Sequence, residues 1–380
     1  MRYVYALLLS LAAAGSVGAQ GVPVASDSVA AVSTPRREKP SFIPLPIVFS
    51  QPETGLGYGL ALLPIWRLGA DTTTRKSNAR LVAWRTQKKQ SLLQLTHTVF
   101  TPNEEFLISG EASYYHQFPI NYYGFGPSTR LADKSIIQYK VFIFNERVLK
   151  RIGRNLFAGA VYRLTNLRDV RVKEGINDDP TQSRLFDRPA QEYTRNTLIS
   201  GVGPALLYDG RDNVLSTYRG SYLELSSLFN SSTLGSDFSF NRFVVDARHF
   251  RPLGQSTNTI LAAQLIGQFH TGTVPFRELA NLGGDRTIRG YYEGRYRDRQ
   301  LLAVQAELRQ HLFGRFNGVA FAGLGQVGNQ FTDLAEGPLK VSGGAGLRFA
   351  FNRRDRLNIR LDYGVGSGSS GVYFSIGEAF

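Results

Sequence analysis

The chain has 380 residues, of which 42% are hydrophobic and 19% are charged, with no Cys and a formal net charge of +14. The lack of Cys excludes a disulfide framework and a thiolate metal site, and no segment supplies the roughly eighteen consecutive apolar residues of a membrane-spanning helix. Because Lys and Arg are scattered, the positive charge favours loops and a lumen that face solvent and anionic lipid headgroups over a nucleic-acid partner.

The N-terminus has the pattern of a secretory signal. Arg2 precedes an apolar run, Val4–Ala14, which is followed by small residues ending at Ala19. We expect cleavage after Ala19, so that 1–19 is a signal peptide. Residues 20–40, rich in Ser, Pro, Ala and charge, are then a short periplasmic tail or linker.

From residue 41 onward, segments of about 9–14 residues recur between turn signals, and several alternate apolar with polar residues, as strands with one apolar face do. In 301–312, for example, Glu307 and Arg309 alternate with Leu308. The predicted strands are 41–50, 55–67, 77–86, 90–101, 104–117, 135–148, 154–166, 197–209, 219–230, 237–250, 257–270, 300–312, 317–328, 341–352, 356–366 and 371–380. A soluble β-sandwich would show the same alternation, but an exported chain with 18 Tyr and 25 Phe favours a transmembrane antiparallel β-barrel of about sixteen strands over 41–380.

The lengths of the connections support this strand order. The three longest, 118–134, 167–196 and 271–299, all fall on the same, extracellular side, as they do in barrels of this kind. The first strand is the weakest prediction, because Pro44 and Pro46 cannot donate ladder hydrogen bonds and belong at an edge or a poorly paired seam. The alternative is an extended lead-in, which leaves fifteen strands.

The stretch 282–296, between two predicted strands, is too rich in Gly and Arg to be a strand itself. Its centre, Ile288, Arg289, Gly290 and Tyr291, resembles the [VI]-R-G-[FY] signature of the Omp85 superfamily, which contains the BamA/TamA and bacterial surface antigen D15 outer-membrane barrels. The resemblance implies a long extracellular loop that folds back into the barrel, with Arg289 bound to polar groups on the inner wall.

A second resemblance concerns the wall that this loop would contact. Residues 321–325 (FAGLG) align with the family's FxDxG strand, with Phe321 in place and Gly323 in the Asp position, so one expected partner of Arg289 is missing. Glu307 lies where the family commonly has another acidic partner. We expect an ion pair between Arg289 and Glu307, because a guanidinium buried in a barrel needs a partner.

A third resemblance is to the family's turn before a strand, written DxRDn…PtrG. It is carried here by Asp209, Arg211, Asp212 and Gly220, with Tyr218 in place of the usual Pro. Asp and Asn side chains in such a turn cap backbone N–H groups, and Gly relieves backbone strain. We expect a structural role for this turn.

The last ten residues resemble the C-terminal signal by which outer-membrane barrels are recognised during assembly. The sequence ends in Phe380, and Phe374 and Ile376 share one face of the predicted last strand, just before Gly377.

The sequence does not indicate an enzyme. The five His residues have no metal-ligand spacing, and no Gly-rich phosphate loop or nucleophile elbow is present. We therefore predict no metal site and no cofactor.

The resemblance as a whole is to Omp85 members without periplasmic POTRA domains, and it implies protein insertion or export at the outer membrane of a Gram-negative type cell. The expected partners are outer-membrane lipid, lipopolysaccharide, and either client outer-membrane proteins or a periplasmic partner, with no nucleic acid. A passive or gated pore and a structural subunit of a larger complex remain as alternatives.

Overall fold

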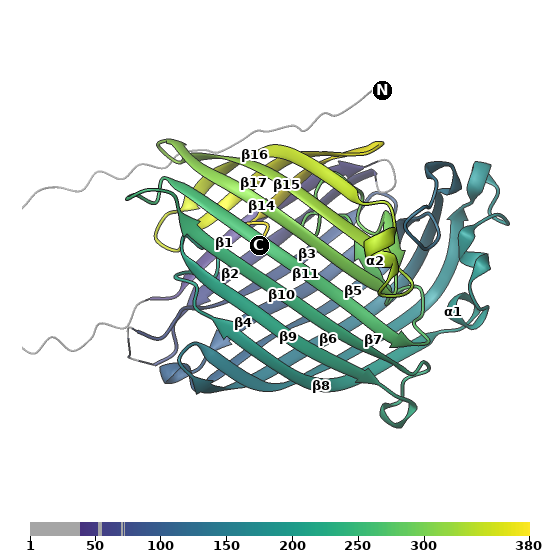
Figure 1. Ribbon diagram of the computed structural model, residues 1–380, viewed down its shortest axis with the longest axis horizontal. Helices are drawn as coiled ribbons and strands as arrows, with labels where there is room; N and C mark the ends of the chain where they lie inside the picture. Colours follow the sequence, from purple (N-terminus) through teal and green to yellow (C-terminus); the bar gives the residue numbers. More distant parts are fainter. Residues whose placement is uncertain (1–38, 52–54, 70, 72) are drawn as a thin grey trace, which may run out of the picture.

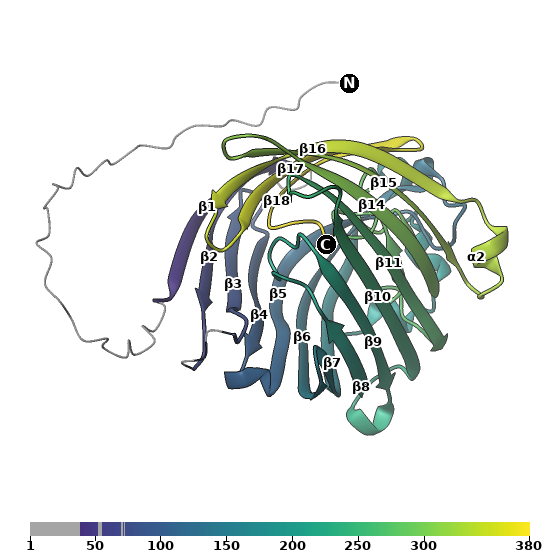
Figure 2. The same cartoon turned by 60° about the vertical axis from the view of Figure 1, so that its left-hand side comes forward.

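The computed structural model describes residues 39–51, 55–69, 71 and 73–380. The predicted signal peptide, and the predicted linker up to residue 38, lie outside this part of the chain. Sixteen strands form one antiparallel sheet in which each strand pairs with the next in the chain, except that a separate two-stranded hairpin interrupts the order. The sheet curls round so that its first strand approaches its last strands (Figure 1 and Figure 2).

The strands of the large sheet are β1 (Ser41–Gln51), β2 (Gly55–Trp66), β3 (Ser77–Thr86), β4 (Ser91–Phe100), β5 (Phe106–Tyr122), β6 (Ser135–Gly153), β7 (Leu156–Glu174), β8 (Thr197–Asp209), β9 (Gly220–Asn230), β10 (Phe240–Pro252), β11 (Thr259–Gly272), β14 (Gln300–Phe313), β15 (Phe316–Gly328), β16 (Lys340–Asn352), β17 (Leu357–Gly366) and β18 (Ser369–Ile376). The small hairpin is β12 (Ala280–Leu282) and β13 (Tyr296–Asp298). The short helices are α1 (Gln191–Thr194) and α2 (Asp333–Glu336), with 3-10 turns at Pro102–Glu104, Leu131–Asp133, Ile176–Asp178, Arg184–Asp187 and Ser232–Leu234. Among the described residues, no helix is long and apolar enough to cross a membrane.

The predicted all-β architecture of sixteen antiparallel strands is confirmed. The segment 41–50 is a strand, because β1 pairs with β2 from Ser41 opposite Ile65 to Gln51 opposite Gly55. The fifteen-strand alternative is therefore wrong.

Two sets of predicted boundaries are corrected. Strands β5, β6 and β7 have 17, 19 and 19 residues and extend well beyond the predicted ends. The alternation breaks at β-bulges, where Gln117 and Asp169 have positive φ angles of 51° and 54°, and an inserted residue reverses which face the next side chains occupy. The last strand was predicted to reach residue 380, but β18 ends at Ile376, because the chain turns inward at Gly377.

The two faces of the sheet differ in polarity along most strands. Outward-facing side chains are apolar and exposed, as in Leu308 (42%), Leu361 (44%) and Phe374 (71%). The residues that alternate with them are polar and buried inside, such as Glu307 and Asp362. This apolar-out, polar-in alternation is the pattern of a barrel that meets lipid on its outer surface.

The connections divide the barrel into two ends. The connections 123–134, 175–196 and 273–299 lie at one end, which we call the long-loop end. At this end Arg130 and Arg184 both donate to Asp133, and the hydrogen bond from Arg130 holds the pKa of Asp133 below its ordinary value. The other end, which we call the short-turn end, carries turns such as 154–155 and 314–315.

Candidate functional site

The connection from β11 to β14, residues 273–299, folds into the barrel, and we call it the inner loop. It contains the small hairpin β12–β13. Several of its side chains are almost fully buried, among them Phe276, Ile288 and Arg289. A β-bridge between Gly126 and Arg297 joins it to the connection between β5 and β6.

The centre of the inner loop lies on a row of inward-facing glycines, which we call the glycine floor: Gly323 and Gly325 of β15, and Gly364 and Gly366 of β17. A Cβ atom added at Gly364 would lie 2.8 Å from the amide nitrogen of Gly290, and one at Gly366 would lie 2.5 Å from the ring of Tyr291. These strands therefore need glycine because the loop lies directly against their backbone.

At Gly323, the Asp position of the family's FxDxG strand, the inner loop makes a different contact with the wall. Ile288 packs over Gly323 and Gly325, and a Cβ atom at Gly325 would come within 2.6 Å of its side chain. With no side chain at Gly323, no carboxylate from β15 reaches Arg289, and the loop makes an apolar contact there instead.

The structure brings Arg289 and Glu307 together. The Arg289 Nη2 atom lies 2.5 Å from Oε1 of Glu307, and Arg289 Nη1 donates to Oδ2 of Asp362 at 2.6 Å. The guanidinium carbon lies 3.7 Å from the centroid of the Phe321 ring. All three charged side chains are fully buried. The second carboxylate thus comes from β17, a position that sequence comparison with the family's motif did not indicate.

These contacts belong to a ring of alternating charges, which we call the charge ring. Its six members, in order around the ring, are Arg289, Glu307, Arg309, Glu378, Arg348 and Asp362. The N–O separations are 2.5 Å for Arg289–Glu307, 2.8 Å for Glu307–Arg309 and 4.0 Å for Arg309–Glu378. They are 2.8 Å for Glu378–Arg348 and 2.6 Å for Asp362–Arg289. The ion pair between Arg348 and Asp362 completes the ring. Three cations and three anions balance, which buried charges require if they are to remain ionised. Beside the ring, Arg360 lies 3.8 Å from Asp362 and pairs with Asp285 at 2.7 Å.

The backbone of the motif is held by the last strand. The N–H of Gly290 donates to the hydroxyl of Tyr373 in β18 at 2.8 Å, and that hydroxyl donates to the carbonyl of Tyr291 at 3.0 Å. The hydroxyl of Tyr291 in turn donates to the carbonyl of Val341 in β16 at 2.8 Å. Gly290 has a φ angle of +108°, which L side chains rarely adopt. The inner loop therefore contacts every strand from β14 to β18.

The comparison with known families agrees with this arrangement. The Omp85 superfamily domain profile matches residues 97–380. The chain belongs to the Omp85 superfamily. This membership places it among outer-membrane β-barrels.

Two solved structures have a similar fold. BamA from Haemophilus ducreyi lacking POTRA domains 1–3 has a TM-score of 0.53 and 14% identity, over 90% of this chain and 70% of that chain. CdiB from Acinetobacter baumannii has a TM-score of 0.55 and 13% identity, over 89% of this chain and 59% of that chain. The Omp85 chain described here thus spans less than two thirds of CdiB. No curated protein sequence matches it.

The turn predicted from Asp209, Arg211, Asp212 and Gly220 lies at the short-turn end of this Omp85 barrel. Asp209 is buried and accepts from the side chain of Arg211 at 2.8 and 3.0 Å. Asp212 accepts from the backbone N–H of Tyr218 at 3.0 Å. Gly220 has a φ angle of +115°, and an added Cβ there would lie 2.2 Å from a backbone oxygen.

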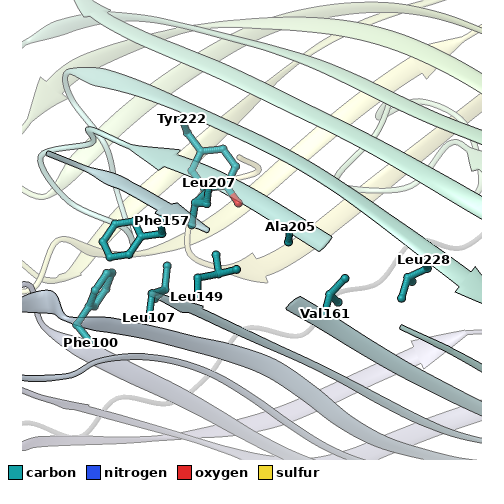
Figure 3. Close-up of a cluster of buried hydrophobic side chains, with 9 residues drawn as sticks. All are labelled: Phe100, Leu107, Leu149, Phe157, Val161, Ala205, Leu207, Tyr222 and Leu228. Carbon is teal, nitrogen blue, oxygen red and sulfur yellow. The ribbon is translucent and has the colours of Figure 1, made fainter. Parts of the chain in front are cut away.

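This turn extends much further than its motif indicates, and we call residues 210–219 the crossing turn. Val214 packs against a cluster of inward-facing apolar side chains on β4–β9, which Figure 3 shows. Its neighbour Leu215 packs against a different cluster, built on the inner faces of β1 and β2. The Asp212 carboxylate accepts from Arg356, on the turn between β16 and β17, at 2.6 Å. The crossing turn, which joins β8 to β9, therefore contacts β1, β2 and the turn between β16 and β17, all several strands away in the sheet order.

The predicted C-terminal residues divide between two environments. Phe374 is 71% exposed on the outer face, whereas Phe380 is 7% exposed and lies inside the barrel. Ile376 ends β18 and packs against the apolar cluster of β1 and β2. Gly377, with a φ angle of +94°, starts the inward turn between them.

The Arg289–Glu307 contact was expected from the sequence, but the remainder of the charge ring was not. Arg309 alternates with apolar residues in its strand, and Asp362 does the same between Leu361 and Tyr363, so a count of inward-facing charges would have grouped them. Glu378 had no such signal, because it lies beyond the point where β18 ends. The glycine floor is visible in the sequence as two pairs of glycines, each pair two residues apart on one strand.

Proposed function

We propose that this Omp85 protein assists the insertion or export of other proteins at the outer membrane of a Gram-negative type cell. The family match supports this role, and one observation carries it: the motif of the inner loop is hydrogen-bonded through Tyr373 to β18, an edge strand of the sheet. A loop held in this way sets the position of the edge at which a new strand would enter.

In this proposal the long-loop end faces the exterior and the short-turn end faces the periplasm. The outward-facing apolar side chains contact lipid, and lipopolysaccharide is the expected neighbour at the long-loop end. Client outer-membrane proteins or a periplasmic partner approach from the short-turn end.

The proposed physical step depends on the two edge strands, β1 and β18. Backbone N–H and C=O groups cannot remain unpaired in hydrocarbon, and an unpaired edge is a template for another strand. β1 carries Pro44 and Pro46, which lack N–H donors and weaken any ladder they join. Separation of β1 from β18 would then cost less than separation of two regular strands, and a client strand would occupy the exposed edge.

Quantitative outer-membrane proteomics of a strain depleted of this protein tests the proposal. We expect loss of a small set of other barrels or surface lipoproteins, with their transcripts unchanged. Re-expression of Arg289→Ala should fail to restore them, whereas Arg286→Ala, an exposed arginine of the same loop, should restore them. Both variants must reach the membrane in equal amounts for this comparison.

An unaltered proteome would contradict the insertion role and favour the two alternatives. A gated pore predicts ion conductance in planar bilayers that rises when residues 273–299 are deleted. A structural subunit predicts a partner that stays bound through purification.

A further inference from the structure

The last four residues of the chain behave as a short peptide bound inside the barrel, and we call residues 377–380 the tail. The ladder of β18 ends with Ile376 opposite Ile359. After the turn at Gly377, whose N–H donates to the carbonyl of Asn358 at 2.8 Å, the chain runs into the lumen. In two views the chain end, marked C, lies within the curve of the sheet (Figure 1 and Figure 2).

The tail places an aromatic ring in a pocket of the wall. The ring of Phe380 lies 6.2 Å from the ring of Phe250 in β10 and 5.5 Å from the guanidinium carbon of Arg309 in β14. Ala262 of β11, opposite Phe250 and fully buried, belongs to the same cluster. A small residue at this position leaves room for the ring between its two larger neighbours. Arg309 also donates to the main-chain oxygen of Phe380 at 3.1 Å.

The tail also places a carboxylate in the charge ring. The side chain of Glu378 is 4% exposed and accepts from Arg348 at 2.8 Å and from Asn358 at 2.6 Å, with Arg309 at 4.0 Å. Each of these arginines has a second carboxylate on the wall, Glu307 for Arg309 and Asp362 for Arg348. The wall therefore orients the arginines without the tail, as the receptor side of a binding site does.

Removal of the tail would leave the ring with one charge unbalanced. Arg289, Arg309 and Arg348 would then face only Glu307 and Asp362. A buried excess cation is costly, so the empty pocket would favour a ligand that supplies an anion at this position and an aromatic ring two residues later.

We propose that this pocket is a peptide-binding site for a segment with an acidic residue two positions before an aromatic residue. The chain's own tail occupies the site in this structure, and a second polypeptide with a segment of the same chemistry displaces it. Occupancy is transmitted to the inner loop, because Glu378 and Arg289 belong to one charge ring. The identification of the natural ligand as a segment of a client protein rests on the proposed function. The existence of the binding site does not.

The test uses the purified barrel in detergent, with residues 377–380 deleted, and a fluorescein-labelled, C-terminally amidated peptide with the sequence of the tail. We expect saturable binding by fluorescence anisotropy. Replacement of Glu by Gln, or of Phe by Ala, in the peptide should each weaken binding by about tenfold or more, since the first removes charge-assisted hydrogen bonds and the second removes a buried ring. The full-length barrel should bind far more weakly, because its own tail competes at an effective concentration on the order of millimolar.

A second readout follows the inner loop. Trypsin should cleave after the exposed Arg286 faster in the deleted barrel than in the full-length barrel, and saturating peptide should restore slow cleavage. A matched control is Phe374→Ala, which alters an exposed residue of β18 and leaves the tail intact. It should bind the peptide as weakly as the full-length barrel does and be cleaved at the full-length rate.

A full-length double variant, Glu378→Gln with Phe380→Ala, keeps every strand residue and serves if the deleted barrel does not fold. Absence of saturable binding to a folded form of either variant would overturn the proposal. Failure of both variants to fold would also overturn it, because a tail that the fold requires is not exchangeable. Neither measurement involves an assembly reaction, so a negative proteomics result would leave this test unaffected.

Discussion

Two parts of the barrel's inner surface are built from opposite chemistry. The wall beneath the inner loop, β14–β18, combines glycines with buried charges, and its contacts are ion pairs and hydrogen bonds. The inner face of β1 and β2 instead presents Ile43, Leu45 and Leu63, all buried. β1 is apolar on its outer face too, where Phe42 is 65% exposed.

The difference corresponds to what covers each part. The charged wall is covered by the inner loop, which brings Arg289 to a fixed place between two carboxylates. The apolar face is covered by Leu215 of the crossing turn, together with neighbouring apolar side chains. Ion pairs require one geometry, because a displaced buried charge loses its partner. Apolar packing is non-directional, so it tolerates small shifts of β1 better than the charge ring tolerates shifts of the loop.

The largest expected effect is at the charged wall. Arg289→Ala leaves Glu307 and Asp362 without their central cation, and we expect the free energy of unfolding to fall by about 3–5 kcal/mol. The measurement is the heat-dependent mobility shift in detergent electrophoresis, together with limited proteolysis of the inner loop. Arg286→Ala is the control for the mobility shift, and it should melt as the unaltered protein does. An unchanged melting temperature with unchanged loop proteolysis would rule out the pairing as a determinant of loop position.

A smaller effect is expected from filling the glycine floor. Gly364→Ala would place a methyl group 2.8 Å from the amide nitrogen of Gly290, and this overpacking should cost about 1–3 kcal/mol. Gly343→Ala is a matched control on the adjacent strand, because its methyl group would meet its nearest atom at an ordinary 3.5 Å. The heat-dependent mobility shift in detergent electrophoresis measures the stability of both variants. Equal stability of the two variants would mean that the loop does not press against β17.

The glycine floor also shows how far the sequence predicts this site. Alternation of apolar and polar residues predicts the strands and their faces, because a barrel between lipid and a polar lumen imposes a period of two. The family's motif indicates which loop enters the barrel and one of its partners, Glu307. It does not indicate Asp362, because a carboxylate from β17, two strands away, can reach the same guanidinium when Gly323 leaves β15 without one. Nor does it indicate Glu378, because the inward turn of the tail arises from packing against distant residues such as Phe250.

A third test addresses the link between the charged wall and the last strand. Tyr373→Phe keeps the ring but removes the hydroxyl that accepts from Gly290 and donates to Tyr291. The buried N–H left without a partner should cost about 1–2 kcal/mol. Tyr363→Phe is the control, since Tyr363 is 54% exposed on the outer face of β17. The effect should be visible as faster hydrogen exchange in β18 relative to β10, and equal exchange in both variants would argue against the link.

The smallest effect is expected at the apolar face. Leu215→Ala removes a half-buried side chain from the cluster on β1 and β2, and the loss of apolar burial should cost about 1 kcal/mol. Because this contact is non-directional, we expect faster hydrogen exchange in β1 and β2 and no change in trypsin cleavage of the inner loop. Val214→Ala, on the same turn, is the matched comparison: it should loosen the cluster on β4–β9 and leave β1 unchanged. If Leu215→Ala instead released the inner loop, the two parts of the wall would be one cooperative unit, and the crossing turn rather than the charge ring would set the position of the loop.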